Sequence, residues 1–258
     1  MSGELAGYRT IVTGGARGIG AVVARGFVEA GARVLILDKR DDLGEALVAS
    51  LPAHMARYRH CDVTDSAQVT AAFEEAARWL GGLDTLVHSA GMDKPGYTPE
   101  DLPEEVFDLV LSVNAKGTYL TNQAAFRLMK EKGGAIVNMG SLAGIRGMPD
   151  RSAYSAAKGA VLAWTRAVAT AWGPYDVTVN AIAPTMGTDV AERYLAQLDP
   201  EERHQLEEDR KRLSPLGGRL GKVEQDLLPL VRLLAEAGGR YMTGQTFAVD
   251  GGRTMLGS

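Results

Sequence analysis

The sequence predicts an α/β protein: a doubly wound parallel sheet of about seven strands with helices on both faces, in a single domain spanning residues 1–258. Three observations predict it. Short β-branched and aliphatic runs alternate with longer helical patterns along nearly the whole chain. The short runs are almost continuously apolar, which is typical of parallel strands covered on both faces. No repeat, low-complexity tract or linker marks a second domain, and 258 residues are enough for one large core.

The expected elements follow in order along the chain. Strands are expected where Val, Ile, Leu and Thr concentrate, at 8–12, 33–37, 58–61, 85–88, 135–139, 177–182 and 246–249. Helices are expected where apolar residues recur three and four apart, at 19–30, 43–50, 66–80, 104–130, 152–172 and from 222 to 236.

The segment after the sixth strand is polar and irregular, and we expect residues 185–222 to form a lid over the substrate. Residues 199–212 within it are dense in charges of both signs. The pattern indicates a solvated helix with local ion pairs. A mobile flap over a pocket is the alternative that we keep for the same residues.

Composition excludes several functional classes. With 28 Lys and Arg against 32 Asp and Glu, the net charge of −4 offers no basic surface for nucleic acid or an anionic membrane. No apolar stretch approaches the ~20 residues that span a bilayer, and the first nine residues do not have the pattern of a secretion signal. The only cysteine, Cys61, is expected to be a buried apolar residue, and a cytoplasmic location is expected. The four histidines have no metal-ligand spacing, so no metal site is expected.

A glycine-rich turn follows the first strand and runs directly into a helix. Gly14, Gly18 and Gly20 give the spacing G-x-x-x-G-x-G, with Arg17 and Ile19 between them. Glycines permit a tight turn and close backbone approach, and a helix N-terminus offers unpaired N–H groups and a positive dipole end. The context predicts binding of a dinucleotide pyrophosphate.

Asp38 ends the second strand and predicts which dinucleotide is bound. A carboxylate at this point accepts hydrogen bonds from the adenosine ribose hydroxyls and repels a 2′-phosphate. Arg17, Lys39 and Arg40 argue for the opposite choice, because a basic residue there could hold that phosphate. We expect NAD rather than NADP.

Tyr154 and Lys158 lie four residues apart in a predicted helix and therefore on one face of it. One positive charge near 4 Å at an effective dielectric of about 20 is worth roughly 4 kcal/mol, or about three pKa units. Such a charge would bring a tyrosine into range as a general acid or base. The same spacing occurs on many solvated helix faces, so the pair alone does not establish a site.

Together these motifs resemble the short-chain dehydrogenase/reductase superfamily, specifically its single-domain NAD(P)-dependent oxidoreductase branch, over residues 8–252. Further motifs in the order of that family are Asp62-Val63, Ser89-Ala90-Gly91, Asn114 and Ser141. Two places depart from its pattern. His88-Ser89 stands where the family usually has Asn-Asn, and after Pro184 the usual glycine is Thr185, with the expected threonine one residue early at Thr188.

The resemblance implies a role for each motif. Tyr154 would exchange the substrate proton, Lys158 would lower the pKa of Tyr154 and hold the nicotinamide ribose, Ser141 would bind the substrate oxygen, and Asn114 would position a proton-relay water. It also implies a homotetramer. The cofactor-binding residues expected from the motifs are Gly14, Arg17, Gly18, Ile19, Gly20, Asp38, Asp62, Val63, Ser89, Ala90, Gly91, Tyr154, Lys158, Pro184, Gly187 and Thr188.

The expected function is NAD-dependent interconversion of a secondary alcohol and a ketone. Ligands of doubly wound sheets bind outside the carboxyl ends of the strands, which predicts a mainly apolar small-molecule pocket. Its expected residues are Met92, Ser141, Leu142, Met148, Tyr154 and Met186. The charged Asp93, Lys94, Arg146 and Arg151 in the same loops are expected to face solvent. Two alternatives stay open: a 3-oxoacyl-thioester reductase using NADP, and a catalytically silent NAD-binding regulator.

Overall fold

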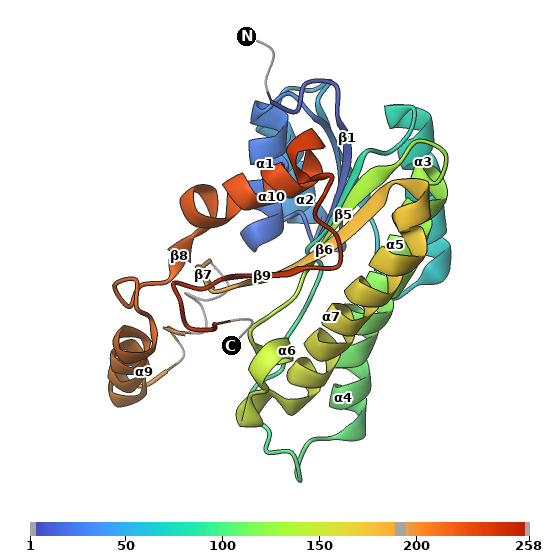
Figure 1. Cartoon of the computed structure of the whole chain (residues 1–258). Coiled ribbons are helices and arrows are strands. Elements are labelled where there is room, and N and C mark those ends of the chain that lie inside the picture. The colour runs from blue at the N-terminus through green and yellow to red at the C-terminus, as the bar shows by residue number, and fades with distance from the viewer. Residues whose placement is uncertain (1–3, 189–194, 197, 256–258) are drawn as a thin grey trace.

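A parallel sheet forms the centre of the protein (Figure 1). The computed structural model describes residues 4–188, 195–196 and 198–255. Within these residues the main sheet has seven strands in the order β3-β2-β1-β4-β5-β6-β9, and each neighbouring pair is parallel. The strands are β1 (Arg9–Thr13), β2 (Arg33–Asp38), β3 (Ala56–His60), β4 (Thr85–His88), β5 (Gly134–Met139), β6 (Val177–Pro184) and β9 (Thr246–Val249). The predicted doubly wound sheet is confirmed.

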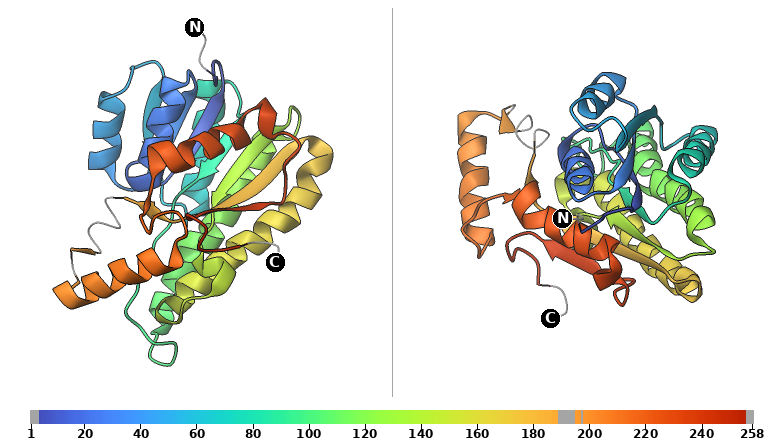
Figure 2. Two further views of the ribbon diagram at one scale, coloured as in Figure 1. Left: turned by 60° about the vertical axis from the view of Figure 1, so that its left-hand side comes forward. Right: turned by 90° about the horizontal axis from the view of Figure 1, so that it is seen from above.

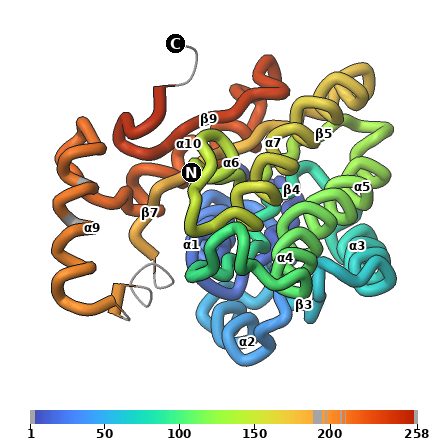
Figure 3. The backbone as a smooth tube through the Cα atoms, turned by 90° about the horizontal axis from the view of Figure 1, so that it is seen from below, coloured from blue at the N-terminus to red at the C-terminus, as the bar shows by residue number. Residues whose placement is uncertain are grey.

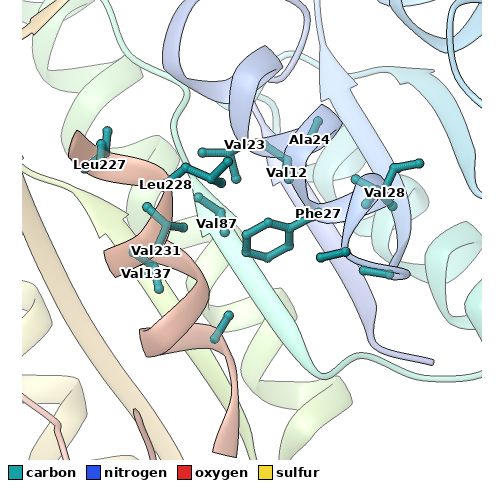
Figure 4. Close-up of a cluster of buried hydrophobic side chains, with 14 of the residues drawn as sticks. Val12, Val23, Ala24, Phe27, Val28, Val87, Val137, Leu227, Leu228 and Val231 are labelled. Carbon is teal, nitrogen blue, oxygen red and sulfur yellow. The ribbon is translucent and has the colours of Figure 1, made fainter. Parts of the chain in front are cut away.

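Two layers of helices cover the two faces of the sheet (Figures 1 and 2). One layer holds α1 (Gly18–Glu29), α2 (Asp41–Ala49) and α10 (Leu228–Ala235), and the other holds α3 (Ser66–Leu80), α5 (Gly117–Met129) and α7 (Ser152–Trp172). Successive strand residues point to opposite faces, so Val12 packs with the first layer and Ile11 with the second. Figure 4 shows the first core, where Phe27 of α1 lies near Val231 of α10.

The helix α3 illustrates how the sequence sets an element. Its apolar residues Val69, Ala72, Phe73, Ala76 and Leu80 recur three and four apart and are all buried. The Asp65 carboxylate caps its first turn by accepting hydrogen bonds from the N–H groups of Ala67 and Gln68. Gly81 ends it in the left-handed region at φ 80°, where a glycine is favoured.

The strand order reverses between β1 and β4, and this switch point locates the site. β1 pairs with β2 on one side and with β4 on the other, whereas the chain reaches β4 only after β3 at the sheet edge. Crossovers on either side of such a point leave a crevice outside the carboxyl ends of the strands. The residues that follow β1, β2, β4 and β5 therefore meet at one end of the sheet.

The helix expected at 104–130 extends without a break from Glu104 to Met129, but it is not α-helical throughout. α4 (Glu104–Leu111) leads into a π-helical segment (Ser112–Lys116), and α5 begins at Gly117. A π turn holds one more residue per hydrogen-bonded ring than an α turn, and such turns are frequent at functional sites. Asn114 lies in this segment and is fully buried. α4 packs against the first half of α7 through Val110, Ala153 and Ala157.

The chain beyond β6 contains more regular structure than the sequence indicated. β7 (Met186–Gly187) pairs with β8 (Gly221–Lys222) in a small parallel sheet, and the charged stretch forms α9 (Pro200–Leu213). Figure 3 shows α9 apart from the helices that cover the main sheet. Residues 189–194 and 197 of the predicted lid lie outside the described residues. In the described part of the chain, every helix is too short or too polar to cross a membrane.

Candidate active site

The glycine turn joins β1 to α1 and approaches the end of β4 closely. Gly14 and Gly18 have φ of 61° and 57°, a region that L side chains rarely adopt. A Cβ on Gly14 would lie 2.6 Å from both the N and Cα atoms of Ala90, and a Cβ on Gly20 would meet the Gly14 carbonyl oxygen. The turn is therefore an open backbone cradle at the N-terminus of α1, and it fits a pyrophosphate.

Asp38 lies beside this cradle, at the end of β2. Its carboxylate accepts hydrogen bonds from the N–H groups of Ala16, at 3.0 Å, and Arg40, at 3.1 Å. Lys39 Nζ lies 3.7 Å from a carboxylate oxygen of Asp62, and Arg40 Nε lies 3.9 Å from one of Asp42. The structure thus holds a negative charge at this point and places a carboxylate beside each of the two neighbouring basic groups.

Asp62 and Val63 follow β3 and close the same end of the sheet. Asp62 Oδ1 accepts hydrogen bonds from the Thr64 N–H at 2.9 Å and the Thr64 hydroxyl at 2.8 Å. Burial raises the pKa of Asp62, but the Thr64 hydrogen bonds and Lys39 together bring it below its usual value. Val63 is buried against Gly117, where a Cβ would lie 2.8 Å from Val63 Cγ2.

His88 occupies the position where the sequence departs from the family's asparagine. It is 1% exposed, and its Nδ1 lies 2.9 Å from the hydroxyls of both Thr13 and Thr121. The Ala90 N–H donates to the same Thr13 hydroxyl at 3.2 Å. Burial lowers the pKa of His88 to about 3, and the charge of Lys158 acts in the same direction. A neutral histidine therefore ties the end of β4 to β1 and α5.

The catalytic residues expected from the sequence come together at the ends of β4 and β5. The Ser141 side chain lies close enough to the Tyr154 hydroxyl to lower its pKa, and Lys158 Nζ lies 5.6 Å from the centroid of the Tyr154 ring. A Cβ on Gly91 would lie 2.8 Å from Asn114 Oδ1 and 3.4 Å from Lys158 Nζ, so these two groups converge beside Gly91. Only a glycine leaves this space open, which fits a cofactor that lies against the end of β4.

The electrostatics of the pair differ from the sequence-based expectation. Burial raises the pKa of Tyr154 to about 12, although the Ser141 hydrogen bond and the Arg151 charge act to lower it. Burial lowers the pKa of Lys158 to about 8, opposed by Asp93. Lys158 Nζ donates to the Met139 carbonyl at 2.7 Å and lies over the ring face. The sequence predicted that the Lys158 ammonium lowers the pKa of the Tyr154 phenol. In this structure the burial of Tyr154 raises that pKa by more.

The predicted pocket residues divide into two groups. Met92 and Met148 are half-buried, and Leu142 is buried next to Ser141. Met186 is also buried, and its Sδ and Cε atoms lie beside Gly221 of β8. The remaining cofactor candidates, Pro184, Gly187 and Thr188, lie at and just beyond the end of β6.

Two charged residues that sequence reasoning assigned to solvent lie beside the site. Arg151 Nη1 donates to Asp93 Oδ2 at 3.1 Å, and both side chains are mostly buried. The proximity of Arg151 to Tyr154 in sequence was the only signal of this pair. Among residues 4–188, 195–196 and 198–255, no group of three His, Cys, Asp or Glu side chains could hold a metal ion.

A dinucleotide cradle at a topological switch point, with a Ser-Tyr-Lys set beside it, defines an NAD(P)-dependent oxidoreductase, and comparisons with known proteins agree. A family model described as "Enoyl-(Acyl carrier protein) reductase" matches residues 14–254. The 3-alpha-(or 20-beta)-hydroxysteroid dehydrogenase of Mycobacterium bovis is 38% identical over 98% of this chain and 91% of its own length. The 2-(S)-hydroxypropyl-CoM dehydrogenase 3 of Xanthobacter autotrophicus is 35% identical over 99% of this chain and 100% of its own.

A solved structure supports the same assignment. A short-chain type dehydrogenase/reductase from Mycobacterium ulcerans superposes with a TM-score of 0.89 at 29% identity, covering 96% of this chain and 90% of that one. The chain therefore belongs to the short-chain dehydrogenase/reductase family, oxidoreductases that use NAD(P).

Proposed function

We propose that the protein is an NAD-dependent oxidoreductase that interconverts a secondary alcohol and a ketone, with cofactor binding and catalysis in a single domain. The observation that carries the proposal is the convergence of Asn114, Ser141, Tyr154 and Lys158 at the ends of β4 and β5, beside the glycine cradle. These groups supply a hydrogen-bond donor for the substrate oxygen, a proton carrier and a buried cation, which is what alcohol oxidation requires.

The mechanism assigns one task to each residue. Ser141 hydrogen-bonds the substrate oxygen, and Tyr154, as phenolate, takes the proton of the hydroxyl and returns it in the reverse reaction. Lys158 is the cation that favours the phenolate, and Asn114, which lies next to it, positions a water that links Lys158 to solvent as a proton relay. When bound, the nicotinamide supplies the hydride acceptor or donor.

The cofactor preference follows from the charges at the end of β2. The Asp38 carboxylate is fixed by two backbone N–H groups and faces the cradle, where it suits ribose hydroxyls and opposes a 2′-phosphate. Lys39 and Arg40 each have a carboxylate within 4 Å. This arrangement supports NAD over NADP. Pro184, Gly187 and Thr188 are proposed to contact the nicotinamide end.

An uncharged secondary alcohol or ketone is the proposed substrate. The half-buried Met92 and Met148 offer apolar surface near Ser141 and Tyr154, and a hydroxysteroid dehydrogenase is among the relatives. Reduction of a 3-oxoacyl thioester with NADP is the second candidate, supported by the acyl-carrier description of the matching family model. We further propose a cytoplasmic homotetramer, as the family resemblance implies, which light scattering on the purified protein would measure.

The proposed function is tested by steady-state kinetics in both directions. A panel of secondary alcohols and ketones, with a 3-oxoacyl thioester added, is assayed with NAD and NADP cofactors. We expect turnover of an alcohol and ketone pair with a clear preference for NAD. Tyr154→Phe should lower kcat by at least about 10³-fold while NADH binding, followed by fluorescence, stays within about twofold.

Three results would count against the proposal. A clear NADP preference with turnover of the thioester alone selects the second candidate. Tight NADH binding without any turnover selects the silent regulator. Retained activity of Tyr154→Phe removes Tyr154 from its role.

A further inference from the structure

The ion pair between Asp93 and Arg151 joins two segments that are 58 residues apart in the chain. Arg151 Nη1 lies 3.1 Å from Asp93 Oδ2, and the side chains are 26% and 22% exposed. The two residues therefore form a mostly buried pair and not the solvent-facing charges that the sequence suggested. A pair of this kind fixes geometry more firmly than an exposed one, because fewer waters compete for it.

Asp93 is connected to the site through its neighbour. The Asn114 amide donates to the Met92 carbonyl at 2.7 Å, and the Met92 N–H donates to Asn114 Oδ1 at 3.4 Å. Asp93 follows Met92 directly, and its own carboxylate accepts from the Lys94 N–H at 2.8 Å. The orientation of Asp93 is thus set from both sides.

Arg151 is connected to the site through α7. It immediately precedes Ser152, the first residue of α7, and stands three residues before Tyr154. The ion pair therefore completes a path of contacts that runs from Asn114 through Met92 and Asp93 to Arg151 and on to Tyr154. Asn114 and Tyr154 lie on different elements, and this path connects the two.

The pair also acts on the site through its charges. Asp93 raises the pKa of Tyr154, whereas Arg151 lowers it. Asp93 also favours the charged form of Lys158, against the lowering that burial causes. The two partners of one ion pair therefore act on the phenol with opposite signs.

Lys158 is buried, lies over the Tyr154 ring and has its own role in the proposed mechanism. The exposed charges near the site are weaker candidates for this effect, among them Asp150, which lies 3.5 Å from Arg151 Nε. The elements packed against α7 also carry ionic side chains, all of them exposed: Glu104, Glu105, Asp108, Lys116, Arg127 and Arg146. Exposed charges are screened by water and salt, so we expect them to change the pKa of Tyr154 less than the mostly buried pair does.

We propose that Asp93 and Arg151 are positioning residues whose ion pair clamps the Asn114 and Tyr154 segments together and holds two opposite charges at the site. The inference rests on the proposed function, in which Tyr154 carries the substrate proton. It predicts opposite effects of neutralising the two partners, which a purely structural ion pair does not produce.

The test is the pH dependence of kcat/KM for NAD-linked oxidation of the best secondary alcohol of the panel. The acid limb of this profile rises as Tyr154 becomes phenolate. Asp93→Asn removes a charge that opposes the phenolate, so the limb should move to lower pH by at least about 0.5 unit. Arg151→Gln removes a charge that favours the phenolate, so the limb should move to higher pH by a similar amount. Arg151→Lys keeps the charge and should keep the wild-type limb position.

A matched control is the exposed pair Arg59–Glu75, at 2.8 Å between β3 and α3. Arg59→Gln and Glu75→Gln make the same charge changes away from the site and should leave the profile in place. The clamp is refuted if both site variants move the limb in the same direction, or if neither moves it while Tyr154→Phe is inactive. If Arg151→Gln does not fold, the Asp93→Asn variant alone tests the proposal: a shift of its acid limb to lower pH supports it, and any other result refutes it. Activity of Tyr154→Phe would instead overturn the proposed function.

Discussion

The side chain of Asn114 holds the backbone of Met92 at both of its polar groups, donating to the carbonyl at 2.7 Å and accepting from the N–H at 3.4 Å. The same amide also donates to the Val110 carbonyl at 2.9 Å, within the widened π turn. One buried side chain therefore satisfies a helix carbonyl and fixes the segment that follows β4. This bond pattern is a structural reason for an asparagine here, besides any part it has in proton relay.

Replacing Asn114 by alanine should damage both stability and turnover. The variant leaves buried backbone groups of Met92 and Val110 without partners, at a cost of about 1–3 kcal/mol in the free energy of unfolding. Because Asn114 also lies beside Lys158, we expect kcat to fall at least about tenfold under conditions in which the variant is fully folded. Thermal unfolding and kcat measured on the same samples check both parts.

Asn180 provides a matched control for this substitution. It is 1% exposed and holds another segment in the same way, donating to the Met242 carbonyl at 2.7 Å and accepting from the Gln245 N–H at 3.1 Å. Asn180→Ala should lose comparable stability and keep its kcat while folded. Equal losses of kcat in the two variants would show that Asn114 acts through stability alone.

Gly14→Ala should impair cofactor binding more than folding. Its Cβ would lie 2.6 Å from two backbone atoms of Ala90, so the turn and the end of β4 must separate, and this moves the N–H groups of the cradle. We expect NADH affinity, measured by fluorescence titration, to fall at least about tenfold. Gly81→Ala is the control, because Gly81 has a φ of 80° but no atom within 4 Å of an added Cβ. Gly81→Ala should cost about 1 kcal/mol of stability and leave NADH affinity unchanged; equal affinity in both variants contradicts the prediction.

Much of the fold was predictable because its determinants are local. Apolar runs located all seven strands of the main sheet to within about two residues, and the glycine turn located the switch-point end of the sheet. The convergence of Ser141, Tyr154 and Lys158 was expected from the resemblance of their motifs, in this order, to those of the family. The position of Asn114 in a π-helical segment was not predictable from local sequence. Its side chain hydrogen-bonds Met92, which lies 22 residues earlier in the chain.

Other features depended on packing that a sequence does not display. The burial of Met186 beside Gly221 depends on the pairing of β7 with β8, two segments that are distant in the sequence. The Asp93–Arg151 pair could not be predicted from the sequence, because charged loop residues usually face solvent and the two partners are 58 positions apart. The pKa of Tyr154 also depends on burial, which opposes the nearby charge that the helical spacing revealed.

His88 should make the protein sensitive to acid. Its pKa is lowered to about 3 by burial, against 6.5 for an unburied histidine. Between these two values the unfolded chain binds a proton that the folded protein does not, so stability falls as the pH falls. From the two pKa values, the loss from this residue alone is about 2 kcal/mol at pH 5 relative to pH 8.

The variant His88→Asn removes the titrating group while its amide can still hydrogen-bond Thr13 or Thr121. We expect its free energy of unfolding, from urea titrations between pH 8 and pH 5, to fall by about 2 kcal/mol less than that of the wild type. His60→Asn serves as the control, because His60 is exposed and pairs with Asp41 at 2.8 Å. Parallel pH profiles for the wild type and His88→Asn would show that His88 is not the acid-sensitive group, since a buried histidine that stays neutral must produce this slope.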